Sequence, residues 1–378
     1  MDSAEREGLR PKGNVPNLRF PEFQGEWEKC KLGDYGKVVT GNTPPTKDIE
    51  NYENGTYLWA SPADLGTIKS ITETKTMLSA QGFSKTRTLP KGSVLVTCIG
   101  STIGKAGMAT KEMSTNQQIN SIVVNDNNDN EFVYYAIQSA FPRYLSSIAV
   151  QAVPIISKSA FELLPNNRPY LQEQKKIGKF LSMLDERIAT QNKIIDKLQS
   201  LIKGVAQKIV HSNKPNVRLS ECLECKSSTL QESEVCEQGT YPVYGANGIV
   251  GYLDNYNTEG EAVYIIKDGS GVGTVFYVTG KCSATGTLNT LQAKEGYSLH
   301  YLYYLLKVFN FEPYKTGMAI PHIYFKDYGK AKVFCPSYTE QLQYARLLSA
   351  IDTKLLIEQN ILTKLSLQKQ YLLRLMFI

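Results

Sequence analysis

Long apolar runs are missing from this chain of 378 residues. No stretch approaches the roughly 20 apolar residues that a membrane-spanning helix requires. The N-terminal segment MDSAEREGLRPKGN is polar and lacks the apolar centre of a secretory signal peptide. We therefore expect a cytoplasmic protein without a membrane partner.

Cysteine and histidine are few and scattered. The seven cysteines form no paired framework, which is typical of free thiols in a reducing compartment. Cys222 and Cys225, followed by Cys236, have half of the spacing of a zinc site, but neither a second CxxC nor a close histidine pair completes it. Unpaired thiols are the favoured interpretation, and zinc is the alternative. The three histidines are far apart in the sequence: His211, His300 and His322.

Charge of either sign is also modest. Charged residues make up 21% of the chain, and 42 Lys and Arg against 36 Asp and Glu leave a formal charge of +6. This balance permits a polyanionic partner without requiring one. A hydrophobic fraction of 42% is enough for buried cores and excludes a disordered chain. The length predicts two or three domains.

What the sequence does contain is a repeat. PYLQEQKKIGKFLSMLDERI (169–188) and PSYTEQLQYARLLSAIDTKL (336–355) align without a gap at an offset of 167 residues. A period this long indicates a tandem duplication of a whole domain with its helix, because solenoid repeats are much shorter. Three further pairs of similar segments precede the two copies: strands entering Gly-rich turns at 93–107 and 262–275, amphipathic helices at 131–140 and 298–309, and segments containing Pro154 and Pro321 at 152–161 and 319–328.

Each copy begins a long helix with a heptad pattern. Residues recur at alternating spacings of four and three from Ile177 to Ile209 and from Tyr344 to Met376, as the a and d positions of a coiled coil do. Either helix alone would expose an apolar stripe, so we expect the two to bury it against each other. Antiparallel packing would bring together the polar residues near the two centres. The predicted contact residues are Leu181, Leu184, Ile188, Gln191 and Ile195 on one helix, with Leu348, Ile351, Leu355, Glu358 and Leu362 on the other.

The sequence therefore predicts an α+β protein. Two globular α/β domains in tandem are separated and joined by two long helices, which form an antiparallel coiled coil with pseudo-twofold symmetry. The expected boundaries are a mobile tail at 1–16, a first domain at 17–168, a central helix at 169–212, a second domain at 213–335 and a C-terminal helix at 336–378.

With these features, the sequence resembles the specificity subunit of type I restriction–modification enzymes. The resemblance rests on NLRFPEFQGEWEKCKLGD (17–34), on TGNTPPT (40–46) and on the repeated EQ-x6-L-x3-D helix start, and it covers the chain from about residue 14. It implies two target-recognition domains that read two short DNA half-sites across a fixed gap, and no catalytic centre.

The resemblance also implies partners. These are double-stranded DNA, two adenine-methyltransferase subunits docked on the helices, and two ATP-dependent restriction and translocase subunits. The chain would direct adenine methylation and cleavage by these subunits. No cofactor is expected in this chain itself, because S-adenosylmethionine, ATP and Mg would be used by the partner subunits.

Enzyme classes find little support in the motifs. GSTIGKAG (100–107) has three residues between its glycines where a P-loop has four, and GSGVGT (269–274) has Thr274 in place of the third glycine of a dinucleotide fingerprint. Both are expected to be hairpin turns. PNNRPY (165–170) has the wrong order for an adenine-methyltransferase motif and is expected to be a loop. A fused glycosyl or nucleotidyl transferase is therefore a weak hypothesis, and a coiled-coil structural adaptor without a DNA role is the main alternative.

Candidate DNA contacts follow from side-chain chemistry. Amides suit adenine edges, whereas Lys, Arg, Ser and Thr suit phosphates. STNQQIN (114–120) concentrates amides, and YGANGIVGY (244–252) is expected to be a Gly-rich loop, although either could be an ordinary polar turn. The candidates in the first domain are Asn116, Gln117 and Gln118 for bases, with Lys85, Arg87, Thr102, Lys105 and Lys158 for the backbone. Those in the second domain are Tyr244, Asn247, Tyr252, Ser270, Thr274, His322, Tyr324 and Lys326.

Overall fold

The computed structural model of this chain describes residues 13–66, 68–148 and 155–378. Most of the expected tail, and Pro154 of the first Pro segment, lie outside the described residues. The chain forms two compact units. The first comprises the residues up to Gln191 together with Ile361–Ile378, and the second comprises Asn192–Asn360. Each long helix therefore contributes to both units.

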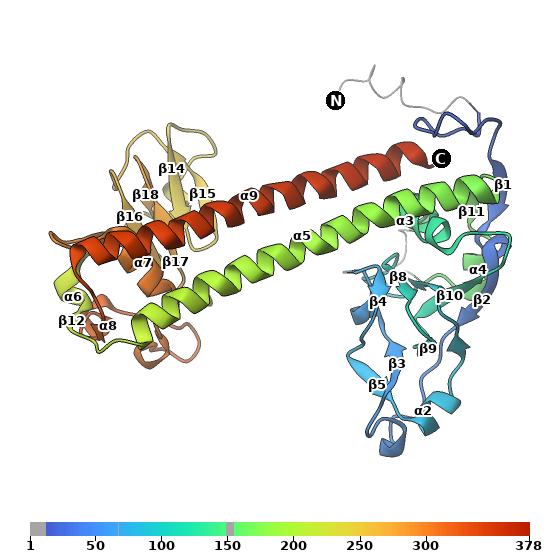
Figure 1. The fold of residues 1–378 in the computed structure, drawn as a ribbon, viewed down its shortest axis with the longest axis horizontal. Helices are drawn as coiled ribbons and strands as arrows, with labels where there is room; N and C mark the ends of the chain where they lie inside the picture. Colours follow the sequence, from blue (N-terminus) through green and yellow to red (C-terminus); the bar gives the residue numbers. More distant parts are fainter. Residues whose placement is uncertain (1–12, 67, 149–154) are drawn as a thin grey trace. The chain divides into compact units, whose positions relative to one another are not determined.

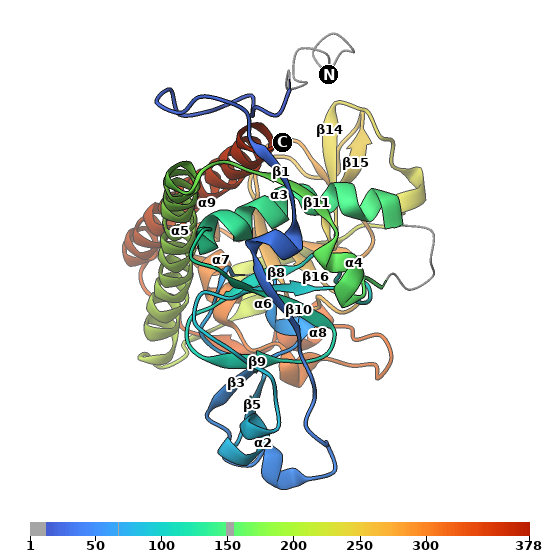
Figure 2. The ribbon, with the colours of Figure 1, turned by 90° about the vertical axis from the view of Figure 1, so that its right-hand side faces the viewer.

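The first unit is built around a five-stranded sheet in the order β2-β10-β7-β8-β4. Helix α3 covers this sheet and lies next to α5, while β3, β5 and α2 lie at the far end of the unit from β1 and β11 (Figures 1 and 2). The elements are β1 (Glu28–Lys31), η1 (Leu32–Tyr35), β2 (Gly36–Thr40), η2 (Ile49–Asn51), β3 (Tyr57–Ala60), η3 (Pro62–Asp64), β4 (Ser70–Ile71), β5 (Thr76–Leu78), α2 (Ala80–Ser84), β6 (Thr88–Leu89), β7 (Val94–Thr97), β8 (Ala106–Ala109), β9 (Met113–Thr115), β10 (Ile119–Val124), α3 (Asn130–Ile148), α4 (Lys158–Glu162), β11 (Pro165–Arg168) and the first half of α5 (Leu171–His211).

Two local expectations change in this unit. The loop expected at 165–170 is wrong, since Pro165–Arg168 forms β11 by pairing antiparallel with β1 near the start of the chain. The helix expected at 131–140 is longer, because α3 continues through Pro142 to Ile148.

The second unit is built around a four-stranded sheet in the order β13-β19-β16-β17, which α7 covers. The Gly-rich loop expected at 244–252 is instead the turn and flanking strands of a β14–β15 hairpin. The elements are β12 (Val217–Arg218), α6 (Leu219–Cys222), β13 (Leu223–Ser227), η4 (Glu232–Glu234), β14 (Tyr241–Gly245), β15 (Gly248–Leu253), β16 (Ala262–Ile266), β17 (Val275–Val278), β18 (Ser283–Ala284), β19 (Leu288–Ala293), α7 (Leu299–Val308), η5 (Glu312–Tyr314), α8 (Phe325–Tyr328), β20 (Lys332–Val333) and, beginning in this unit, α9 (Tyr338–Met376).

The two units share one framework. The order β13-β19-β16-β17 repeats β2-β10-β7-β8, and β17 and β19 begin 169 residues after β8 and β10 (275 − 106 and 288 − 119). Both expected hairpins are confirmed, since β7 pairs antiparallel with β8 and β16 pairs antiparallel with β17. Each unit also has a two-stranded antiparallel sheet, β1-β11 or β12-β20, whereas the remaining sheet has four strands in the first unit and three in the second. The duplication therefore preserved the main sheet, its helix and the two-stranded sheet, while the third sheet diverged.

Within each unit the long helices run antiparallel. In the first unit, Ile177 and Leu181 at the start of α5 share a core with Leu372 and Met376 at the end of α9. In the second unit, the end of α5 packs against the start of α9, where Ile202 and Ala206 join a cluster with Leu348, Ile351 and Leu355. All ten predicted contact residues are buried or half-buried, as an a/d seam requires.

The duplicated glutamine of the repeat is buried where each long helix meets its domain. Gln174 is 1% exposed. Its Nε2 donates to the carbonyl of Pro169 at 2.9 Å, and its Oε1 accepts from the backbone N–H of Asp129 at 3.0 Å, one residue before α3. One amide thus joins the segment before α5 to the start of α3.

The second unit repeats this joint. Gln341 is 2% exposed, donates to the carbonyl of Pro336 at 2.9 Å and accepts from the N–H of Ser298 at 2.9 Å, at the start of α7. Because the first N–H groups of a helix have no partner within it, the amide satisfies a group that would otherwise be buried unpaired.

The duplicated aspartate makes a second joint. Tyr135 of α3 donates its hydroxyl to Asp185 at 2.6 Å, and Tyr304 of α7 donates to Asp352 at 2.8 Å. Burial raises the pKa of both tyrosines, so they remain neutral donors at physiological pH. Lys369 of α9 adds an ion pair to Asp185 at 2.7 Å in the first unit. Each long helix is therefore tied to its domain by two polar contacts about three turns apart.

Gln174→Leu and Gln341→Leu remove the joint amide with little change in volume. We expect each substitution to lower the free energy of unfolding by about 1–3 kcal/mol, because it leaves one buried and one partly buried backbone group without the amide as partner. Denaturant unfolding of the purified chain measures this loss. The exposed Gln172 and Gln343 of the same helices supply matched Gln→Leu controls, and equal effects at joint and control positions would contradict the prediction.

Candidate nucleic-acid interface

Most predicted contact residues of the first unit lie at one end of its main sheet. At this end β2 and β7 finish and their antiparallel neighbours β10 and β8 begin. We call it, and its counterpart between β13, β19, β16 and β17, the loop end of the sheet. Three loops leave it in the first unit, at 41–48, 98–105 and 116–118.

Asn42 and Thr43 together connect two of the predicted segments. Its Oδ1 accepts from the N–H of Arg87 at 2.8 Å, and its Nδ2 donates to the carbonyl of Lys85 at 2.9 Å. Thr43 donates to Oε1 of Gln117 at 2.5 Å. Asn42 and Thr43 were missed as site residues, although both lie in the TGNTPPT motif on which the family resemblance partly rests. Their role depends on partners more than 40 positions away, which a local pattern does not reveal.

The amide cluster at 116–118 divides into two roles. Asn116 is only 8% exposed, and its side chain bonds to Gln118 through both its oxygen (3.0 Å, from the N–H) and its nitrogen (3.1 Å, to Oε1). Asn116 therefore shapes the turn. Gln117 points outward and is exposed, as are Lys85 and Arg87. Gln117 is thus the amide of the three that is best placed to meet a base edge.

The Gly-rich turn of the first unit lies at the same end. The N–H of Ile156 donates to the carbonyl of Cys98 at 2.8 Å, which fixes the Pro segment beside the turn. Lys105 is exposed and Thr102 half-buried at the tip, and Lys158 begins α4 just beyond. The structure therefore brings both groups of first-domain candidates to one edge.

The second unit presents a similar but not identical edge. Ser270 and Thr274 are exposed in the Gly-rich turn between β16 and β17. His322 lies against this turn, with Nδ1 2.7 Å from Oδ1 of Asp268. Tyr324 and Lys326 follow and are exposed, and the ammonium of Lys326 lies 5.3 Å from the centre of the Tyr324 ring.

The β14–β15 hairpin joins this edge through its backbone. The N–H of Thr285 donates to the carbonyl of Tyr244 at 2.9 Å. The Tyr244 ring packs on Tyr264, and burial raises its pKa, so it serves the core more than a ligand. Tyr252 is half-buried, whereas Asn247 is exposed in the turn. Asn247 is therefore the hairpin residue best placed for contact.

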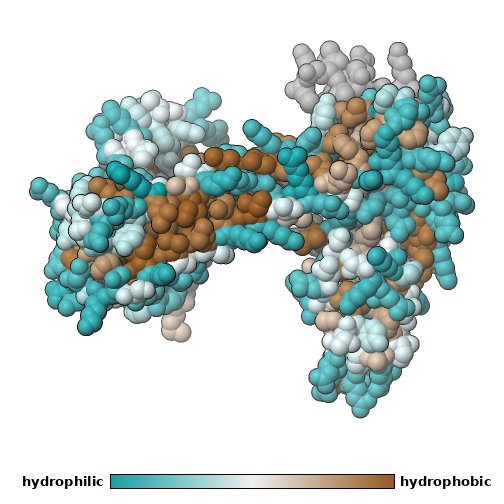
Figure 3. Space-filling view, in the orientation of Figure 1, coloured by the Kyte–Doolittle hydropathy of each residue, from teal (hydrophilic) through white to brown (hydrophobic). Residues whose placement is uncertain are grey.

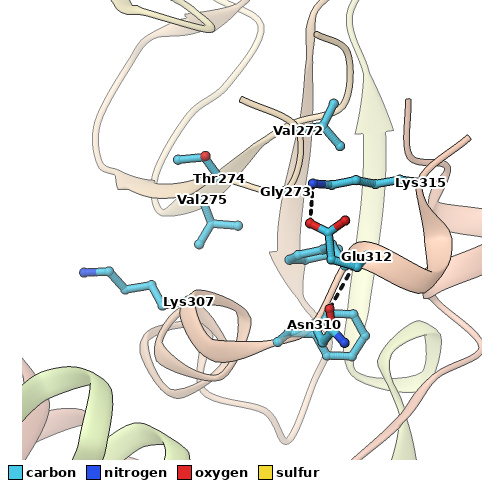
Figure 4. Close-up of a pocket in the computed structure, with 10 residues that line it drawn as sticks. Val272, Gly273, Thr274, Val275, Lys307, Asn310, Glu312 and Lys315 are labelled. Carbon is cyan, nitrogen blue, oxygen red and sulfur yellow. Dashed lines mark hydrogen bonds and ion pairs between the residues drawn. The ribbon is translucent and has the colours of Figure 1, made fainter. Parts of the chain in front are cut away.

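A cavity of about 420 Å³ lies beside the Gly-rich turn of the second unit. Thr274, Phe311 and two lysines are among its lining residues. Lys315 pairs with Glu312 at 2.5 Å, whereas Lys307 points away on the opposite side (Figure 4). Because the two ammonium groups do not converge and one is neutralised, the cavity lacks the charge of an anion-binding pocket.

The cysteines do not assemble as the zinc spacing would require. Cys222 Sγ lies 3.8 Å from Sγ of Cys335, and hydrogen bonding from that thiol lowers the pKa of Cys222. Cys225 lies on β13, and Cys236 is exposed near β15. Within the described ranges, no three His, Cys, Asp or Glu residues are grouped to hold a metal ion. None of the helices in the same ranges has both the length and the apolar character needed to cross a membrane.

The chain matches the family model of the type I restriction modification DNA specificity domain twice, at residues 24–200 and 212–367. These two matches cover most of the sequence and follow the two units' shared framework, so the protein belongs to this family.

Relatives and solved structures agree with this assignment. The MjaIX type I restriction enzyme specificity subunit of Methanocaldococcus jannaschii is 30% identical over 46% of this chain and 42% of its own length. The HindI specificity subunit of Haemophilus influenzae is 28% identical over 47% and 40%. Each alignment therefore spans less than half of the relative. The S subunit of a type I restriction–modification system from M. genitalium has the same fold, with a TM-score of 0.67 at 20% identity over 96% of this chain and 99% of that one.

Lys105→Ala and Gln117→Ala separate the two kinds of DNA contact. Loss of a phosphate contact at Lys105 should weaken binding to all duplexes and reduce the salt dependence by about one counterion. Loss of a base contact at Gln117 should cost about 1–3 kcal/mol on the cognate duplex only. Fluorescence anisotropy at several salt concentrations measures both. Lys91, exposed near the opposite end of β7, supplies the control Lys91→Ala, and an effect there as large as at Lys105 would contradict the prediction.

Proposed function

We propose that this chain is the DNA-binding specificity subunit of a type I restriction–modification complex and that each unit reads one half of a bipartite site. The observation that carries this proposal is one framework present twice, with different loops at its loop end. The shared sheet and helix give the two units equivalent scaffolds. The divergent loops give each unit its own DNA-recognition surface. A structural adaptor without a DNA role would need no such divergence, and the family match argues against it.

We also propose that partner subunits, and not this chain, catalyse the reactions of the complex. Adenine methylation and ATP-dependent cleavage would be performed by two methyltransferase subunits and two restriction subunits. S-adenosylmethionine, ATP and Mg would then belong to those partners. The exposed amide, hydroxyl and ammonium groups at the loop ends suit recognition, since such groups hydrogen-bond to base edges and phosphates. The complex would act in the cytoplasm.

The long helices supply docking faces for the methyltransferase subunits in this proposal. Phe180 on α5 and Leu347 on α9 occupy equivalent positions of the repeat, 167 residues apart, and are 39% and 51% exposed. Met183 and Ile357 are 59% and 48% exposed. Apolar surface runs along both helices (Figure 3). Exposed apolar stripes of this kind mark protein contacts, and two equivalent positions suit two copies of one partner.

The proposed domain boundaries remain those expected from the sequence. Target-recognition domains at 17–168 and 213–335 would be spaced by the helices at 169–212 and 336–378 with pseudo-twofold symmetry. Half-sites on one face of B-DNA repeat every 34 Å or so, and helices of this length, about 60 Å at 1.5 Å per residue, can span such a distance.

Methylation mapping tests the function directly. The chain should be coexpressed with its methyltransferase subunit in a host free of adenine methylation, and N6-methyladenine located by sequencing. We expect one bipartite motif. Exchange of loop 114–120 should change one half of the motif and leave the other half intact, because each unit reads independently. A stable complex that methylates nothing, or a change in both halves, would count against the proposal.

Lengthening the two long helices tests whether they set the gap between the half-sites. One extra heptad near the middle of each long helix keeps the a/d register and adds about 10 Å. We expect the gap between half-sites to grow by about three base pairs, at 3.4 Å or so each, with both half-sites unchanged. The mapped motif of the lengthened protein gives the result. An active complex whose gap stays the same would show that the helices do not set the spacing.

A further inference from the structure

The segment after η5 in the second unit forms a tight finger. Thr316 and His322 exchange both backbone hydrogen bonds, at 2.9 and 2.7 Å, and close a turn over Gly317–Pro321. Gly317 has a φ of 86°, a conformation that side chains with a Cβ rarely adopt. We call residues Gly317–Pro321 the finger.

The finger is braced against the Gly-rich turn at the loop end. The N–H of Gly269 donates to the carbonyl of Pro321, and the N–H of Ile323 donates to the carbonyl of Lys267, both at 2.9 Å. The side chains of His322 and Asp268 add a third contact at 2.7 Å. Ile323, which follows the finger, is 1% exposed and packs in the core of the second unit. These contacts, all made by residues 321–323, attach the base of the finger to the Gly-rich turn.

The tip of the finger is apolar and faces outward. Met318 is fully exposed, at 107% of its reference area, and Ile320 is 58% exposed. Leaving apolar surface uncovered is unfavourable relative to burying it. Met318 and Ile320 gain the free energy of burial only when a partner covers them. The tip therefore has the character of a contact surface.

The charges around the finger indicate a nucleic-acid partner. The carboxylates beside it have partners within the unit: Asp268 contacts His322, Glu312 pairs with Lys315, and Asp327 pairs with Lys330. Lys326 is exposed just after the finger and makes no ion pair among the described residues. A duplex presents this combination of partners, with phosphates for the ammonium groups and apolar base faces for the tip.

The first unit anchors its corresponding segment in the same way. Ile155 bridges to Ile99, and the N–H of Ile156 donates to the carbonyl of Cys98 beside that unit's Gly-rich turn. Ile155 is 54% exposed. The residues that would form the tip there lie outside the described ranges. The anchoring is therefore a property of the shared framework and not an accident of one loop.

We propose that the finger is a DNA wedge. Met318 and Ile320 enter the minor groove and partly unstack a base step at the second half-site, and Lys326 contacts an adjacent phosphate. Apolar side chains inserted from the minor groove kink the duplex and widen the surface that a protein can contact. This inference rests on the proposed DNA-reading function and adds a deformation step to it.

The test uses the specificity and methyltransferase subunits together, with duplexes carrying the mapped motif. One 2-aminopurine is placed at successive positions of the second half-site, because its fluorescence rises when the base unstacks. We expect a rise at one step with the unaltered complex. The double substitution Met318→Ser with Ile320→Ser should abolish that rise and weaken binding about tenfold or more, since buried apolar anchors dominate interface affinity. Both side chains are exposed, so folding should be unaffected.

Two control variants separate the alternatives. Ile68→Ser changes an isoleucine that is 66% exposed in the first unit and should leave binding and fluorescence unchanged. Met183→Ser changes an exposed residue of the proposed docking face on α5 and should affect only association with the methyltransferase subunit, measured by size-exclusion chromatography.

The outcomes are distinct. If the unaltered complex does not bind the duplex, the proposed function fails. If it binds without a fluorescence rise, or if the finger variant keeps the rise and the affinity, the wedge is wrong. If the finger variant loses the methyltransferase subunit while keeping DNA binding, the finger is a protein-docking element and the wedge is again wrong.

Discussion

The buried amide of Gln174, repeated by Gln341, is the interaction on which the rest of the structure depends. Each amide joins the carbonyl before a long helix to the N–H of the residue that directly precedes the helix covering the main sheet. A side chain at 1–2% exposure must form both bonds or lose the free energy of two buried polar groups. In each unit, both hydrogen bonds can therefore form in only one position of the long helix relative to its domain. Asp185 and Asp352 add a second point of attachment, so rotation about the first is also restricted.

Because this joint is at the opposite end of the sheet, the loops at the loop end can differ in sequence without weakening it. The loop end is remote from the glutamine in the framework, and its loops bond mainly to one another, as Asn42 does with the segment from Lys85 to Arg87. Loops can then change their side chains without disturbing the core beneath α3 or α7. A protein that must read different sequences on a constant mount gains from this separation, because specificity can change while stability and subunit docking remain constant.

Modest charge is consistent with reading by shape and hydrogen bonds. A net charge of +6 on 378 residues gives little long-range attraction to a polyanion, and Lys315 and Lys330 have carboxylate partners within the unit. Directional amides such as Gln117 and Asn247, together with the apolar finger, would then supply discrimination that charge alone does not give. Association with partner subunits on the helices would add further contacts to the complex.

The local patterns were read correctly from the sequence. The antiparallel long helices, the two Gly-rich hairpins and the duplicated framework depend on patterns along the chain, and the structure confirms all three. Residues whose partners are distant in the sequence were not. Pro165–Arg168 is a strand only because β1 lies beside it, the buried Asn116 donates its N–H to the carbonyl of Ala60, and Cys222 meets Cys335 across 113 positions. By itself the sequence determined that two similar domains are joined by two long helices with a heptad pattern. Tertiary structure alone decided which side chains reach solvent at the loop ends, because burial depends on long-range packing that no local period encodes.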